Sequence, residues 1–130
     1  MPALSPVLAT PADAALPYSP AVLASGPVRT LYISGQVGID ASGQVPADFE
    51  GQVRAAFANL EAVLAAAGMG LGDLAKVTAF LTDPADYAGY GALRTALLKG
   101  HKPASTLVIA AALARPEWRF EIEAVAVAAA

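Results

Sequence analysis

The chain of 130 residues contains no cysteine and only one histidine, His101. The lack of cysteine excludes disulfides, thiol nucleophiles and thiolate metal sites. A single histidine also disfavours a histidine-based metal centre, because such centres usually draw on several imidazoles. We therefore predict no metal site, and we expect His101 to lie in a solvated loop.

Charged residues are scarce as well, at 15% of the chain, and the eight lysines and arginines form no basic cluster. Nucleic-acid binding requires several phosphates to be neutralised together, so no nucleic-acid partner is expected. No lysine or arginine precedes Arg29, and proline and aspartate interrupt the apolar stretches before it. This pattern fits neither a secretion signal nor a membrane span, so we expect a cytoplasmic protein without a membrane partner.

Hydrophobic residues make up 56% of the chain. So little polar surface cannot cover the molecule comfortably, and part of the apolar surface is expected to meet another subunit. The length is that of one ordinary domain with a core of its own, so residues 1–130 are assigned to a single domain.

The hydrophobic periodicities predict an α/β (α+β) fold with a mixed sheet of about six strands. Apolar residues recur at three- and four-residue spacing from Phe49 to Ala67, which indicates a helix. Asp83 followed by Pro84 is typical of a second helix start, and that helix should run to about Lys99. Strands are expected at 4–9, 21–25, 28–34, 73–81, 104–111 and 119–127, with the second and third forming a hairpin across Gly26-Pro27.

The last of these strands is the most informative, because side chains alternate between the two faces of a strand. One face would carry Phe120, Ile122, Ala124 and Ala126, and the other Glu121, Glu123, Val125 and Val127. Two helices can cover only one face of the sheet, so the acidic face must be buried by association. Acids on such a face must lie in an aqueous cleft or pair with a cation, which makes it the first candidate for chemistry.

Five segments in order, 17–22, 33–37, 68–78, 103–104 and 121–127, resemble the Rid/YjgF family of reactive intermediate deaminases. They read PYSPAV, ISGQV, GMGLGDLAKVT, PA and EIEAVAV. The resemblance spans nearly the whole chain and implies a chorismate-mutase-like fold. It also implies a homotrimer whose sheets form a central barrel, with a small-molecule cleft at each subunit interface.

The activity that this resemblance implies is hydrolysis of enamines or imines, such as 2-aminoacrylate, to a keto acid and ammonia without a cofactor. Such an enzyme anchors the substrate carboxylate, positions a water molecule and moves protons. Carried over to this sequence, Glu121 would be the catalytic residue that orients or deprotonates the water. Tyr18 and Ser34 would line the cleft, together with backbone groups near Gly35.

The sequence departs from the family at two positions. The arginine that pairs with the substrate carboxylate in deaminase members is replaced by Ser105, and the frequent asparagine of the second helix by Gly91. Ser105 would then contact a ligand without this charge pairing, and an uncharged or larger substrate is expected. Arg119 is two residues from Glu121, which predicts that it shares a strand face with Glu121 and can supply the missing cation.

Several alternatives remain open at this point. Glu121 can instead pair with Arg119 or with a lysine of a neighbouring subunit and hold the trimer together. Glu123 is interpreted as structural. Ser105 can be a strand hydroxyl without a ligand. The chain can also be a Rid homologue that binds a small molecule without hydrolysing imines. A ribonuclease activity is disfavoured by the acidic net charge, and chorismate-mutase chemistry would share the fold alone.

Overall fold

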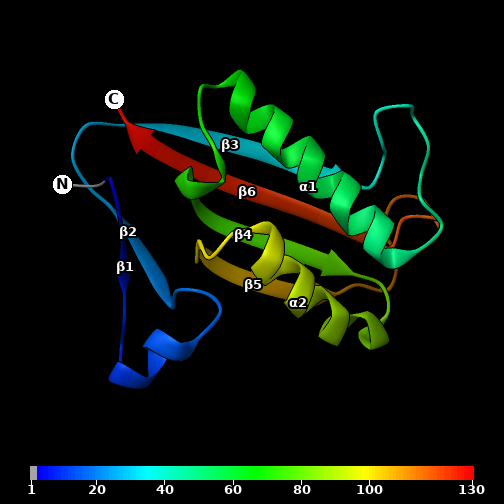
Figure 1. Cartoon of the computed structure of the whole chain (residues 1–130), viewed down its shortest axis with the longest axis horizontal. Coiled ribbons are helices and arrows are strands. Elements are labelled where there is room, and N and C mark those ends of the chain that lie inside the picture. Colours follow the sequence, from blue (N-terminus) through cyan, green and yellow to red (C-terminus); the bar gives the residue numbers. More distant parts are fainter. Residues whose placement is uncertain (1–2) are drawn as a thin grey trace.

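The computed structural model describes residues 3–130. Within that range the chain forms two α-helices and six strands, and the strands are divided between two sheets. The larger is a four-stranded mixed sheet in the order β3-β6-β4-β5, and the smaller pairs β1 with β2 (Figure 1). The elements are β1 (Leu4–Val7), β2 (Ala21–Ala24), β3 (Val28–Val37), α1 (Phe49–Ala66), β4 (Leu74–Leu81), α2 (Tyr87–Leu97), β5 (Ala104–Ile109) and β6 (Phe120–Ala129).

Both helices pack on the same face of the four-stranded sheet, as predicted. The ring of Phe120 on β6 stacks with Phe57 of α1 at 6.3 Å and contacts Tyr90 of α2 at 5.1 Å. Figure 1 shows α1 along β3 and β6, and α2 in front of β4 and β5. The mixed α and β class is confirmed, although the six strands are divided between two sheets.

The alternation predicted for the last strand is confirmed. Phe120, Ile122 and Ala126 are completely buried beneath the helices. Glu123 is exposed and Glu121 is half-buried on the opposite face. That opposite face also carries Tyr32 of β3, which pairs with Val125 and is 79% exposed. The face without helices is therefore open in one protomer and bears both acids and large apolar groups.

The helix boundaries follow from local chemistry. Asp48 accepts a hydrogen bond from Gly51 N and caps α1, which ends where Gly68 adopts a positive φ of 71°. Asp83 accepts from Ala85 N and begins a short 3₁₀ turn that leads into α2. The predicted helix starts are thus confirmed to within a turn.

The predicted hairpin between 21–25 and 28–34 is wrong. β2 pairs antiparallel with β1, in the register Leu4↔Ala24 to Val7↔Ala21. β3 pairs instead with β6 across most of its length. The reason is competition for strand edges, because residues 4–7 offer β2 a full-length partner and β6 offers β3 a longer one. Gly26, with a φ of 78°, carries the chain from the small sheet to the large one.

Candidate functional site

The Glu121 carboxylate lies directly against Gly35. The pairing of β3 with β6 shifts register between Ile33 and Gln36, so Ser34 and Gly35 form an irregularity in the ladder. A Cβ added to Gly35 would fall 1.9 Å from Oε2 of Glu121. Bulges of this kind re-aim side chains beside functional sites, and here glycine is required for space because φ is not positive. The sequence predicted both residues, and the structure brings them together with Ser34.

Glu121 has no fixed partner in the protomer. Within residues 3–130 its carboxylate makes no ion pair and no side-chain hydrogen bond. The nearest cation along the same face of the neighbouring strand, Lys76 of β4, donates instead to Thr106 of β5. Both carboxylate oxygens of Glu121 therefore remain available to accept protons or hydrogen bonds.

Arg119 does not share the face of Glu121, so this prediction is wrong. Its guanidinium Nη2 donates to both carboxylate oxygens of Asp86, at 3.0 and 2.9 Å, and its guanidinium carbon lies 5.6 Å from the centre of the Phe49 ring. Asp86 and Phe49 belong to the helix side. Arg119 precedes the first residue of β6, and the alternation of a strand does not extend beyond its end.

A buried glutamine that sequence reasoning missed fixes the start of β6. Gln52 of α1 is 1% exposed and donates from Nε2 to the carbonyl oxygens of Pro46 and Glu117, each at 2.9 Å. Its Oε1 accepts from Arg119 N at 2.8 Å. Two of these bonds tie the loop before β6 to α1, and the third joins that helix to Pro46 in the loop before it. The signal was an amide three residues after Phe49, on the core-facing side of the helix.

Ser105 lies far from Glu121 within one protomer. It pairs with the buried Val77 of β4, which places it on the helix side, whereas Glu121 pairs with Phe80. The two pairing positions on β4 are separated by about 10 Å along the strand. One protomer therefore does not bring Ser105 and Glu121 together.

Tyr18 is held beside the beginning of β5. Ser19 donates its backbone N–H to Pro103 O at 3.2 Å and its hydroxyl to Lys102 O. The half-buried Tyr18 thus stands near the strand that carries Ser105, and not near Glu121. Of the predicted site residues, the protomer groups Glu121 with Ser34 and Gly35, and it groups Tyr18 with the start of β5.

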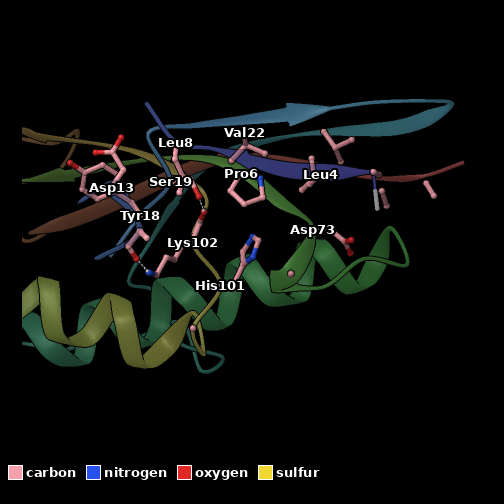
Figure 2. Close-up of a pocket in the computed structure, with 17 residues that line it drawn as sticks. Leu4, Pro6, Leu8, Asp13, Tyr18, Ser19, Val22, Asp73, His101 and Lys102 are labelled. Carbon is pink, nitrogen blue, oxygen red and sulfur yellow. Dashed lines mark hydrogen bonds between the residues drawn. The ribbon is translucent and has the colours of Figure 1, made fainter. Parts of the chain in front are cut away.

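A cavity of about 670 Å³ opens between the small sheet and the turn before β5 (Figure 2). Its wall is mainly apolar and includes Tyr18, with Asp13, His101 and Lys102 among its polar groups. His101 was expected in a solvated loop, but it is half-buried and its Nε2 lies 2.7 Å from Leu74 O. The cavity is formed by segments far apart in the chain, and no local pattern of residues indicates it.

Two burial effects distinguish α2. The hydroxyl of Tyr90 has no hydrogen-bond partner within residues 3–130, and burial raises the pKa of Tyr90 to about 12. Tyr90 is therefore a neutral phenol at physiological pH. The Nε of Arg94, one turn later, is also buried and unpaired among the described residues.

Neither metal ligands nor membrane spans are found in the part of the chain that the structure describes. Residues 3–130 contain no group of three or more histidine, aspartate or glutamate side chains placed to hold a metal ion. No helix in this range has the length and apolar character needed to cross a membrane.

Comparisons with known proteins identify the family of the chain. The model of the family described as "Endoribonuclease L-PSP" matches residues 9–128. A 2-iminobutanoate/2-iminopropanoate deaminase of Mus musculus is 40% identical over 121 residues, covering 91% of this chain and 87% of that protein.

Solved structures show the same fold. The Rid-family protein YyfB from Yersinia pestis, described as of unknown function, superimposes with a TM-score of 0.83 at 32% identity and covers 95% of this chain and 98% of that one. TdcF from E. coli with bound serine gives a TM-score of 0.70 at 30% identity, covering 95% of this chain and 92% of that one. The chain therefore belongs to the endoribonuclease L-PSP family, which is the Rid/YjgF family.

Proposed function

We propose that this protein is an enamine/imine deaminase that acts on an atypical substrate in clefts between the subunits of a homotrimer. The observation that carries the proposal is the Glu121 carboxylate, held over Gly35 and without a cation or hydrogen-bond partner in residues 3–130. Relatives named as iminobutanoate/iminopropanoate deaminases, about 40% identical, support the reaction class.

The proposed reaction needs little from the protein beyond positioning and proton transfer. Glu121 accepts a proton from a water molecule while the water oxygen attacks the electrophilic imine carbon. The proton then passes to the imine nitrogen and gives a carbinolamine. Glu121 next moves the hydroxyl proton of the carbinolamine to its amino nitrogen while the carbon–nitrogen bond breaks, and a keto acid and ammonia leave. Each imine consumes one water, and no electrons are exchanged. General base catalysis of this kind contributes about 10²–10⁴-fold to a rate.

The proposed cleft requires two protomers. Ser105 lies on the helix side, opposite the middle of β4, and Glu121 on the open side, opposite the end of β4. Contact between a Ser105–Tyr18 edge of one subunit and the Glu121–Ser34–Gly35 cluster of the next would unite the predicted residues. Association would also cover the open face, where Tyr32 is 79% exposed.

Ser105 is the reason for proposing an atypical substrate. A truncated, desolvated arginine–carboxylate contact costs about 2–5 kcal/mol, which weakens binding roughly 30-fold or more. The substrate would therefore be uncharged near Ser105, or larger than 2-aminoacrylate. The small serine side chain also leaves volume that an arginine would occupy.

Restoring the arginine tests this substrate assignment. We expect Ser105→Arg to raise kcat/KM for 2-aminoacrylate by about tenfold or more, because a guanidinium can pair with the small substrate's carboxylate in a bidentate manner. The measurement is keto-acid formation from 2-aminoacrylate generated in situ. Ser105→Lys serves as a control that adds the charge without the planar fork. If neither variant is more active on 2-aminoacrylate than the wild-type protein, the assignment is contradicted.

A second candidate function is binding of a small molecule without imine hydrolysis. The serine-bound TdcF structure favours it, because a Rid-family relative can hold an amino acid in the structure described. The absence of an arginine at Ser105 favours it as well. This candidate shares the interfacial cleft with the first and differs only in turnover.

Two measurements test the proposal together. Light scattering at micromolar concentration should give three times the chain mass of 13.1 kDa. The decay of enzymatically generated imines, from small to large amino acids, should accelerate when the protein is added. A monomer would remove the interfacial cleft, and a trimer that accelerates none of these imines would favour binding without turnover.

A further inference from the structure

Arg94 is a half-buried arginine without a partner on the helix side of the sheet. Most cations in residues 3–130 are engaged: Arg119 with Asp86, Arg54 with Glu50, Arg29 with Ala67 O, Lys76 with Thr106 and Lys102 with Ala14 O. Arg94 makes no ion pair or hydrogen bond within that range. Its Nε is buried, but the two terminal Nη atoms are not among the buried unpaired atoms of the described residues, so they are the groups that a ligand can reach.

The guanidinium of Arg94 is oriented by an aromatic ring. Its central carbon lies 5.8 Å from the centre of the Tyr90 ring, one helical turn earlier. Tyr90 is 1% exposed and contacts Phe120 at 5.1 Å, so the ring is fixed in the core. An arginine that rests on a fixed ring loses less freedom on binding than one in solvent.

The surface beside Arg94 is open. A Cβ added to Gly91 would meet no atom within 4 Å. Residues three apart lie on the same side of a helix, so Arg94 borders this open space.

Arg94 and Ser105 face the same layer of the molecule. Ser105 pairs with Val77, which is 1% exposed under the helices. Figure 1 shows α2 lying in front of β4 and β5. Ser105, where β5 carries no cation, and the unpaired Arg94 of α2 thus belong to the same side of the sheet, over the half formed by β4 and β5.

We propose that Arg94 is the carboxylate anchor of this protein and replaces, from α2, the arginine absent at Ser105. This inference rests on the proposed imine-hydrolysing cleft. The ligand class is a 2-imino or 2-oxo acid, whose planar carboxylate matches the guanidinium fork. With the cation on the helix and serine on the strand, the volume beside Ser105 is left for a larger substrate side chain.

Binding of a stable product analogue tests the anchor without turnover. Calorimetric titration would compare 2-oxobutanoate with its uncharged amide, 2-oxobutanamide. We expect wild-type protein to prefer the acid, and Arg94→Leu to bind the acid about 30-fold more weakly while the affinity for the amide is unchanged. Arg54→Leu, which removes an exposed arginine from α1, should behave as wild type.

A conservative variant covers the event that Arg94→Leu does not fold, as judged by its thermal melt. Arg94→Lys keeps the charge but loses the planar fork of the guanidinium. We therefore expect it to prefer the acid over the amide, but less strongly than the wild-type protein does. Wild-type preference for the acid in a folded Arg94→Leu or Arg94→Lys protein would overturn the proposal, as would a wild-type protein that binds the acid no better than the amide.

The same variants separate this inference from the proposed function. Arg94-dependent binding of 2-oxobutanoate without any imine hydrolysis would support the anchor and refute the deaminase activity. Imine hydrolysis with carboxylate binding that does not depend on Arg94 would support the deaminase activity and overturn the anchor.

Discussion

Replacing Glu121 by glutamine is expected to lower kcat for imine hydrolysis by about 10²–10⁴-fold, the usual contribution of a general base. The amide is nearly isosteric with the carboxylate and can still occupy the space over Gly35, but it cannot accept a proton from water. Because Glu121 has no ion pair in residues 3–130, the substitution breaks no salt bridge within the protomer. Stability and KM should therefore change little. The measurement is kcat and KM on the best imine substrate, with a thermal melt of each protein.

Glu123 provides the matched control. It is the same residue type on the same face of the same strand, two positions away, and it is exposed. Glu123→Gln changes the net charge as Glu121→Gln does, so general electrostatic effects cancel in the comparison. We expect its activity to stay within about twofold of wild type, as is usual for surface substitutions. Equal losses in both variants would assign the acids to a shared structural role and remove Glu121 from the mechanism.

The sequence predicted the face of Glu121 correctly because strand alternation is a local rule. Phe120, Ile122, Ala124 and Ala126 are apolar at every second position, and all of them are buried. The helix boundaries were equally local, since Asp48, Asp83 and Gly68 act within one turn. Features of this kind depend on a few adjacent residues, and a single sequence contains them.

The errors arose where the outcome depends on competition between distant segments. The hairpin prediction failed because β2 pairs with β1, and the relative strengths of the two possible pairings cannot be read from local residue patterns. The prediction for Arg119 failed because strand alternation was extended one residue beyond Phe120, the first residue of β6. Arg119 lies before that residue, and its guanidinium pairs with Asp86, 33 residues away in the sequence.

The candidate site shows the same division. Glu121 and Gly35 were identified separately, through a resemblance of motifs. Their contact depends on the register shift between Ile33 and Gln36, which pairing with β6 produces. Gln52, which makes two hydrogen bonds to the loop before β6 and one to Pro46 before α1, was missed because a polar residue in an amphipathic helix normally indicates the solvent side.

The contact between Gly35 and Glu121 leads to the second large expected effect, from Gly35→Ala. The added methyl group would lie 1.9 Å from Oε2 of Glu121, so the carboxylate must move. A displacement of about 1 Å in a catalytic group can cost about 100-fold in rate, and we expect kcat to fall by that order. The backbone φ of Gly35 is not positive, so alanine causes no conformational strain of its own. Steady-state kinetics with a thermal melt would measure the effect.

Gly89→Ala is the matched control, because a Cβ at Gly89 meets nothing within 4 Å and lies on an exposed part of α2. That variant should keep its activity and gain up to about 1 kcal/mol in stability, the usual difference between alanine and glycine within a helix.

The double variant Gly35→Ala/Glu121→Gln is decisive. If the methyl group acts only by displacing the carboxylate, the two losses are not additive, and the double variant should be no slower than Glu121→Gln alone. Fully additive losses would mean that Gly35 contributes to the reaction independently, for example through its backbone N–H, and that the steric explanation is wrong.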